Sequence, residues 1–121
     1  MENRRAQRVA KLLEREIPAL LSLLPELPSR DLVTITGVEV TRDLRHARVY
    51  YSVLTNQEED WHLVAKFLAR HAKGLRHELA GRVVLKYHPE IRFLPDPTAA
   101  HAARIEALLK QIHPTDAGGT S

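Results

Sequence analysis

Apolar residues near the N-terminus recur at spacings of three and four positions. Those that share one helical face are Ala6, Val9, Leu13, Ile17, Leu20 and Leu24. This period predicts an amphipathic helix from Arg4 to about Leu24. Pro18 lies opposite the apolar face and lacks an N–H, so we expect a kink or a restart of the helix there. The PELPSRD segment that follows contains two prolines and three charged residues, which predicts a loop.

Two β-rich runs come next, joined by a short polar connection around Arg42 and Asp43. Residues 33–40 read VTITGVEV and residues 46–54 read HARVYYSVL, both rich in β-branched and aromatic side chains. They predict an antiparallel hairpin. The alternation changes phase at Gly37, which predicts a β-bulge. Asp43 could be catalytic, but Asp is a common turn residue whose side chain bonds nearby backbone, so the turn role is favoured.

A second helix is indicated where the NQEED segment places acids ahead of another apolar stripe. The stripe consists of Trp61, Val64, Leu68, Ala72, Leu75 and Leu79. Gly74 interrupts it, and a glycine inside a helix costs about 1 kcal/mol relative to alanine. The helix therefore either tolerates Gly74 or breaks there.

From Val83 the period becomes two, which predicts a strand as far as Phe93. On this reading Tyr87 faces the core, and Pro89 makes the strand an edge or ends it, because proline cannot donate to a ladder. Asp96-Pro97 supplies an N-cap and a first-turn proline for a last helix. Its apolar residues are Ala100, Ile105, Leu108, Leu109 and Ile112.

Length and composition narrow the class of protein. The chain has 121 residues, 44% of them hydrophobic, and no cysteine. We expect one domain over residues 1–113, with the last helix from about 97, followed by a flexible tail over 114–121. Without cysteine there is no disulfide, thiol nucleophile or thiolate metal site. No apolar run approaches the ~18 residues of a membrane span, so we expect a cytoplasmic protein with no membrane partner.

The formal net charge of +3 conceals an uneven distribution. Residues 61–94 hold seven cations and two acids, next to three acids at 58–60. The cations and histidines that project from one side of the second helix are His62, Lys66, Arg70, Lys73 and His77, and the first helix repeats the pattern with Arg4, Arg8, Lys11 and Arg15. Like charges at these spacings disfavour a helix, so the pattern indicates either a solvated face or a surface that binds a polyanion.

Signatures of catalysis and metal binding are missing. The sequence contains no GxxxxGK[ST], GxGxxG, GxSxG or HExxH motif, and its seven histidines lack metal-ligand spacing. We expect no enzyme activity, metal, cofactor or small-molecule substrate. The chain has six aromatic residues, and Trp61 and Tyr87 are assigned to the core, so few aromatic side chains remain to stack on bases. Contacts to the RNA backbone are therefore favoured.

Several segments together resemble one family. The segments RRAQRVAKLLEREI, VTITGVEVTRDLRHARVYYSV, AKGLRHELAGRV, YHPEIRFLPD and ARIEALL follow one another as in bacterial ribosome-binding factor A. The resemblance covers about residues 4–110 and implies an α+β, KH-like type II fold. In that fold a helix, a hairpin, a helix-kink-helix and a strand build helices on a three-stranded sheet, here with a C-terminal helix.

The resemblance also implies a site. In the family an Ala-x-Gly kink replaces the GxxG loop of RNA-binding KH domains, and Ala72-Lys73-Gly74 fits that motif. Lys73 would then be a phosphate contact at the kink. Besides the two helical rows, the predicted surface for RNA and ribosome contacts includes Arg45, Gly74, Arg76 and Arg82.

The function implied by the resemblance is that of a monomeric assembly factor. It would bind the free 30S ribosomal subunit and its 16S rRNA, assist late maturation including processing of the 5′ end, and support growth in the cold. The alternatives are a general KH-like RNA or DNA binder without a ribosomal role, a small enzyme, and a purely structural interaction module. The absence of GxxG disfavours the first alternative.

Overall fold

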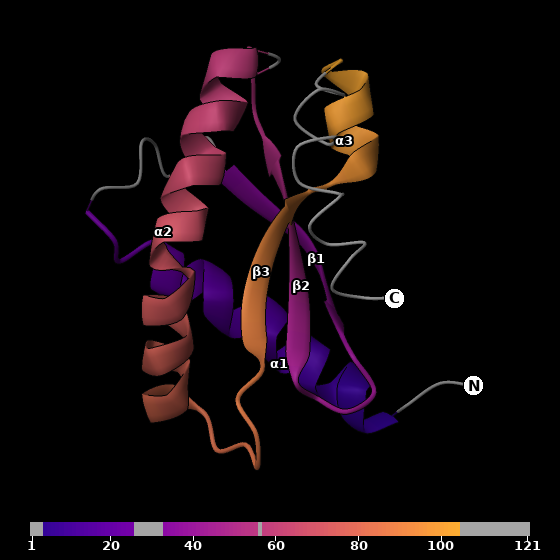
Figure 1. Ribbon diagram of the computed structural model, residues 1–121, viewed down its shortest axis with the longest axis vertical. Coiled ribbons are helices and arrows are strands. Elements are labelled where there is room, and N and C mark those ends of the chain that lie inside the picture. Colours follow the sequence, from indigo (N-terminus) through magenta and orange to yellow (C-terminus); the bar gives the residue numbers. More distant parts are fainter. Residues whose placement is uncertain (1–3, 26–32, 56, 105–121) are drawn as a thin grey trace.

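The computed structural model describes residues 4–25, 33–55 and 57–104. Six elements follow in order: α1 (Arg4–Leu21), β1 (Val33–Val40), β2 (His46–Val53), α2 (Glu58–Arg82), β3 (Glu90–Pro95) and α3 (Pro97–Ala102) (Figure 1). The predicted α+β class and the order of elements are confirmed. Most of the PELPSRD loop, the last helix beyond residue 104 and the tail over 114–121 lie outside the described residues.

The sheet has the strand order β1-β2-β3. β1 and β2 pair antiparallel, which confirms the hairpin, and the register shifts between Ile35 and Gly37, which confirms the bulge. β3 pairs parallel to β2, with His46 opposite Glu90 and Tyr51 opposite Pro95. This mixed sheet, with β3 at one edge, is the KH-like type II arrangement.

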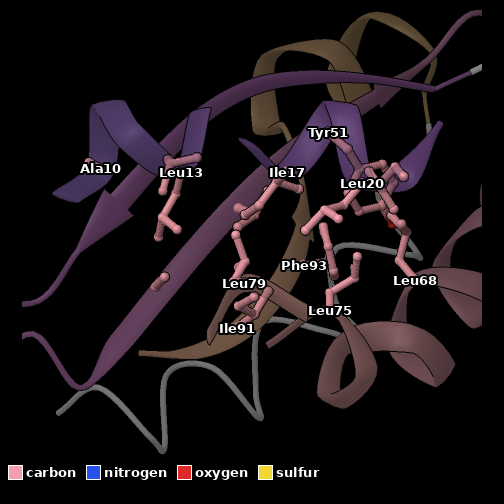
Figure 2. Close-up of a cluster of buried hydrophobic side chains, with 14 of the residues drawn as sticks. Ala10, Leu13, Ile17, Leu20, Tyr51, Leu68, Leu75, Leu79, Ile91 and Phe93 are labelled. Atoms are coloured by element: carbon pink, nitrogen blue, oxygen red, sulfur yellow. The ribbon is translucent and has the colours of Figure 1, made fainter. Parts of the chain in front are cut away.

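Two long helices pack beside the sheet and enclose the core. α1 contacts β1, α2 contacts β3, and the two helices also contact each other. Leu13 and Ile17 of α1, Leu75 and Leu79 of α2, and Phe93 of β3 meet in one hydrophobic cluster (Figure 2). Because apolar stripes at helical spacing meet alternate residues of the strands, helices and sheet bury each other's hydrophobic faces.

The proline in α1 does not interrupt that helix. α1 is continuous from Arg4 to Leu21 with Pro18 inside it, so the helix does not restart there, and the alternative, a kink, stays a prediction. Pro18 is exposed, as its position opposite the apolar face predicts, while Ile17 and Leu20 on either side are buried. The carbonyl of Glu14, which would otherwise accept the N–H of residue 18, therefore lies on the solvent side of the helix, where water can bond it. The packing of the buried face keeps the turns before and after Pro18 in one helix.

The second helix is also continuous. α2 spans 25 residues without a break, so it does not divide into two separate helices at Ala72-Lys73-Gly74, and the kink there stays a prediction. Gly74 is exposed and its φ is not positive, and a Cβ added there would meet nothing within 4 Å. Leu68 and Leu75 are buried on either side of it, and this packing outweighs the weak helix propensity of glycine. No helix in the described ranges is long and apolar enough to cross a membrane.

The final strand begins later than its sequence pattern predicts. The ladder starts at Glu90, and residues 83–89 form a loop between α2 and β3. The prediction that Tyr87 faces the core is wrong, since 50% of this residue is exposed. Val83 is buried and Leu85 packs against the hydrophobic core, which explains the alternation of apolar residues over 83–87. Pro89, which follows, has no backbone N–H to donate to a strand ladder.

Candidate nucleic-acid interface

A row of cations on α2 faces away from the core. Lys66, Arg70, Lys73 and His77 are exposed, whereas Trp61 and Leu68 on the opposite side are fully buried. Among the described residues, Lys66, Arg70 and Lys73 form no ion pair or side-chain hydrogen bond. We call these three residues the α2 row. Their positive charges are therefore available to an anionic partner.

The first residue of the predicted α2 surface is less available. His62 lies one turn after Glu58, and its Nε2 is 3.5 Å from a Glu58 carboxylate oxygen. Glu58, Glu59 and Asp60 occupy the first turn of α2, where carboxylates interact favourably with the helix dipole. This confirms that they are helix-start charges. The acidic end of α2 separates the α2 row from the loop before the helix.

The cations of α1 divide into two groups. Arg4, Arg8 and Lys11 are exposed along the outer side of the helix. Arg15 instead lies 3.6 Å from Glu16, and Glu16 also receives a 3.0 Å hydrogen bond from Nε of Arg82 at the end of α2. Two residues assigned to RNA contact thus share one carboxylate. Sequence spacing could not reveal this pairing, because Arg82 and Glu16 lie 66 positions apart.

A groove between α2 and β3 brings the second half of the α2 surface together with the sheet edge. Its volume is about 590 Å³. The polar residues that line it are Lys73, Arg76 and His77 from α2, and His88, Glu90 and Arg92 from β3 and the preceding loop. Arg92 was missing from the predicted surface, although it alternates with the apolar residues Ile91 and Phe93, which was a usable signal. The polar part of the lining therefore consists of cationic side chains and histidines with one carboxylate, and Ala69, Ala72, Ala80 and Ile91 supply the apolar part.

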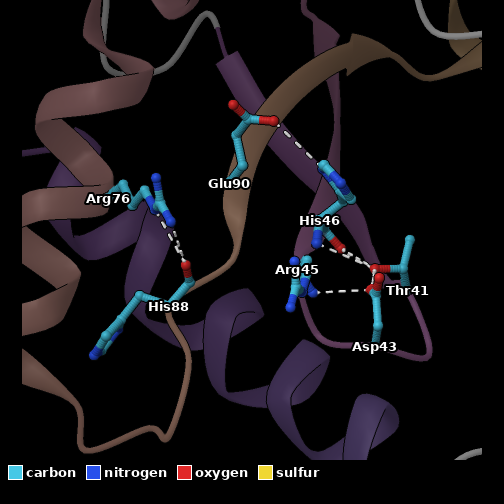
Figure 3. A network of polar contacts seen from close by, with 7 residues as sticks. All are labelled: Thr41, Asp43, Arg45, His46, Arg76, His88 and Glu90. Atoms are coloured by element: carbon cyan, nitrogen blue, oxygen red, sulfur yellow. Dashed lines mark hydrogen bonds and ion pairs between the residues drawn. The ribbon is translucent and has the colours of Figure 1, made fainter. Parts of the chain in front are cut away.

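Arg76 has a structural role within this groove. Its Nε and Nη2 donate to the backbone carbonyl of His88 at 3.1 and 3.0 Å (Figure 3). The guanidinium thereby ties α2 to the loop that precedes β3. The exposed Gly74 adds no side chain to the surface between Lys73 and Arg76.

The hairpin turn holds the last predicted contact residue. The Asp43 carboxylate accepts hydrogen bonds from the Thr41 hydroxyl at 2.7 Å and from the Arg45 N–H at 3.1 Å (Figure 3). The Thr41 hydroxyl, and then the Arg45 N–H, lower the pKa of Asp43. The turn role of Asp43 is confirmed. Arg45 is exposed, and its carbonyl accepts the Glu90 N–H at 2.8 Å, which fixes the start of β3.

Clustered ligands for a metal are not found in the part of the chain that the structure describes. No group of three or more His, Asp or Glu side chains there could hold an ion. The arrangement instead offers exposed cations on a rigid helix and a groove beside it. These features suit contacts to a phosphate backbone.

The fold and the site define a KH-like type II domain with a cationic helical surface. The family model described as ribosome-binding factor A matches residues 5–109. The protein of that name from Syntrophobacter fumaroxidans is 39% identical over 114 residues, which cover 93% of this chain and 97% of the relative. The chain therefore belongs to the ribosome-binding factor A family.

Solved structures agree with this assignment. The crystal structure of ribosome-binding factor A from Thermus thermophilus has a TM-score of 0.63 at 26% sequence identity, covering 74% of this chain and 94% of that chain. A homology model of the Thermus thermophilus factor, fitted into the cryo-EM map of a 30S complex of that factor, has a TM-score of 0.51 at 27% identity. The alignment covers 69% of this chain and 90% of that one.

Proposed function

We propose that this protein binds the free small ribosomal subunit through its 16S rRNA and assists late maturation of that subunit, including processing of the 5′ end. It acts as a cytoplasmic, monomeric and non-enzymatic factor, with a role in growth in the cold. The observation that carries the proposal is the α2 row, three exposed cations without partners among the described residues, in a family named for ribosome binding. The fitted Thermus thermophilus 30S complex supports the choice of subunit.

The proposed contact is electrostatic. Each side chain of the α2 row reaches one phosphate, and Arg4, Arg8 and Lys11 of α1 extend the surface. If about five phosphates are neutralised in all, counterion release gives a log-log salt slope of about −4 for the binding constant. A slope near zero between low and moderate salt would count against phosphate contacts.

Assistance to maturation requires a preference between two states of the subunit. A factor without catalytic groups can shift an equilibrium only by its differential affinity for the two states. The protein is therefore expected to hold an rRNA conformation found in immature or free small subunits, and to block premature use of the decoding region. Its affinity for them should exceed its affinity for translating ribosomes.

A binding comparison tests this proposal. Labelled protein is titrated with purified free small subunits, with translating ribosomes and with short single-stranded oligonucleotides. Tight binding to free subunits alone is the expected result. Equal binding to subunits and ribosomes would remove the maturation role, and equal binding to oligonucleotides would favour a general KH-like RNA binder.

A further inference from the structure

The loop between α2 and β3 is held at several points. Val83 is buried, and its N–H donates to the Leu79 carbonyl at 2.9 Å. Leu85 packs against the core, and Pro89 is buried at the far end. Between these two residues, the Arg76 guanidinium donates two hydrogen bonds to the His88 carbonyl (Figure 3). The backbone path of residues 83–89 is therefore fixed from both sides.

The same loop turns an aromatic ring and a cation outward. Tyr87 has half of its surface open to solvent, Val84 is fully exposed, and Lys86 is exposed between them. The Lys86 ammonium lies 5.5 Å from the centre of the Tyr87 ring, within the range of a cation–π contact. The Tyr87 ring and the Lys86 charge therefore lie together on the solvent side of a loop whose backbone is held in place.

The surroundings of this pair select the kind of partner. His88, the next residue along the chain, lines the groove that also contains Lys73, Arg76, His77 and Arg92. Glu90 is the one carboxylate in that lining. An acidic ligand with a flat apolar part matches a tyrosine ring beside cations, and an unpaired nucleotide has both features.

We propose that Tyr87 stacks on an unpaired base of the bound RNA, while Lys86 contacts the phosphate of the same or the adjacent nucleotide. The inference rests on the proposed function, which supplies the RNA. It adds a base contact to a surface otherwise built for phosphates. Because every base has a π-face, the contact gives affinity and a position for a single-stranded nucleotide with little sequence preference.

Variants of the full-length protein test the stacking contact, with binding measured on free small subunits. Removal of a stacking ring weakens binding by about five- to a hundredfold, so Tyr87→Ala should show a loss in that range. Tyr87→Phe keeps the π-face and should bind within about twofold of the original protein. Tyr87→Leu keeps an apolar side chain without a π-face and should lose affinity as Tyr87→Ala does.

The salt dependence separates the roles of the two residues. Tyr87→Ala should lower affinity at every salt concentration without changing the log-log slope, while Lys86→Ala should reduce the slope by about one. A merely structural role of Tyr87 would leave binding by the folded variant unchanged. Circular dichroism should show a native spectrum for each variant, because both side chains are exposed.

Any of three results would overturn the inference while leaving the proposed function intact. If Tyr87→Ala binds like the original protein, no base stacks there. If Tyr87→Leu binds normally, or if Val84→Ala loses as much affinity as Tyr87→Ala, the loop is an apolar contact for a ribosomal protein. Failure of the unmodified protein to bind small subunits would instead overturn the proposed function, and the stacking contact with it.

Discussion

The guanidinium of Arg76 donates two hydrogen bonds to the backbone carbonyl of His88, at 3.1 and 3.0 Å (Figure 3). The two residues lie twelve positions apart. Their contact joins α2 to the residue that precedes the buried Pro89 and the start of β3. A residue assigned to RNA contact therefore also fixes the loop that carries Tyr87.

Arg76→Ala is expected to destabilise the protein by about 1 kcal/mol, because it removes two charge-assisted hydrogen bonds at a solvent-exposed site. Arg76→Lys should recover only part of the loss, since an ammonium cannot reproduce the fork of the guanidinium. Urea denaturation measures the effect. Arg70→Ala is the matched control, exposed on the same helix without a described partner, and should change stability by less than about 0.5 kcal/mol. Equal effects of the two alanine variants would contradict the bracing role.

Gly74→Ala is expected to stabilise the protein by about 1 kcal/mol. The reason is that Gly74 lies inside a continuous helix with open space at its Cβ position and without positive φ. Thermal denaturation followed by circular dichroism measures the change. Gly81→Ala, at a second exposed glycine of α2 with open space, should act in the same direction. A destabilised Gly74→Ala beside a stabilised Gly81→Ala would show that the helix needs a kink at residue 74.

Tyr51→Phe is expected to stabilise the protein by about 1 kcal/mol. Tyr51 is 1% exposed, its ring centre lies 6.1 Å from that of Trp61, and its hydroxyl has no hydrogen-bond partner among the described residues. A buried hydroxyl without a partner loses its hydration and gains nothing in return. Urea denaturation at neutral pH measures the gain. Tyr87→Phe, which removes a hydroxyl from a half-exposed ring, should leave stability unchanged.

The Tyr51 hydroxyl also predicts a pH dependence. Burial raises the pKa of Tyr51 well above its ordinary value of 10.0. The folded protein therefore keeps this proton when the unfolded chain has lost it, so the free energy of unfolding falls as pH rises above about 10. The fall approaches about 1.4 kcal/mol per pH unit and is absent below that pH. The difference between the original protein and Tyr51→Phe isolates this contribution, and a difference independent of pH would contradict it.

Asp43→Ala is expected to lower stability at neutral pH, because the carboxylate accepts the Thr41 hydroxyl and the Arg45 N–H that form the hairpin turn. These bonds lower the pKa of Asp43 below its ordinary value of 3.8. Its contribution is therefore present above about pH 4 and disappears as pH falls through the lowered pKa. Denaturation midpoints of the two proteins should converge in acid. Asp43→Asn, which keeps an acceptor oxygen without a titrating carboxyl, provides the control.

The sequence predicts those features of the fold that depend on neighbouring residues. Gly37 at a change of phase predicted the bulge, and Asp96-Pro97 predicted the start of α3. Asp96 caps that helix by accepting the Thr98 and Ala99 N–H groups. The hydrophobic period and helix capping depend on residues only a few positions apart, so the amino-acid sequence alone is enough to predict these features.

Features that depend on distant contacts could not be predicted. The pairing of Glu16 with Arg82 and the support of His88 by Arg76 join segments that only the folded chain brings together. The exposure of Tyr87 was missed because alternation alone does not distinguish a ladder from a loop with two anchored side chains. The kink at Gly74, which the family resemblance implies, stays a prediction, because an unbroken helix such as α2 can still bend.

We propose that the α2 row binds the free small ribosomal subunit. Sucrose-gradient sedimentation of the tagged protein in cell extract tests it most directly. The original protein should travel with free small subunits, and the variant with Lys66→Glu, Arg70→Glu and Lys73→Glu together should remain at the top of the gradient while keeping a native circular dichroism spectrum. Arg104→Glu, which reverses an exposed cation outside the predicted surface, should sediment like the original. A triple variant that still travels with free small subunits, or an original protein that does not, would contradict the account.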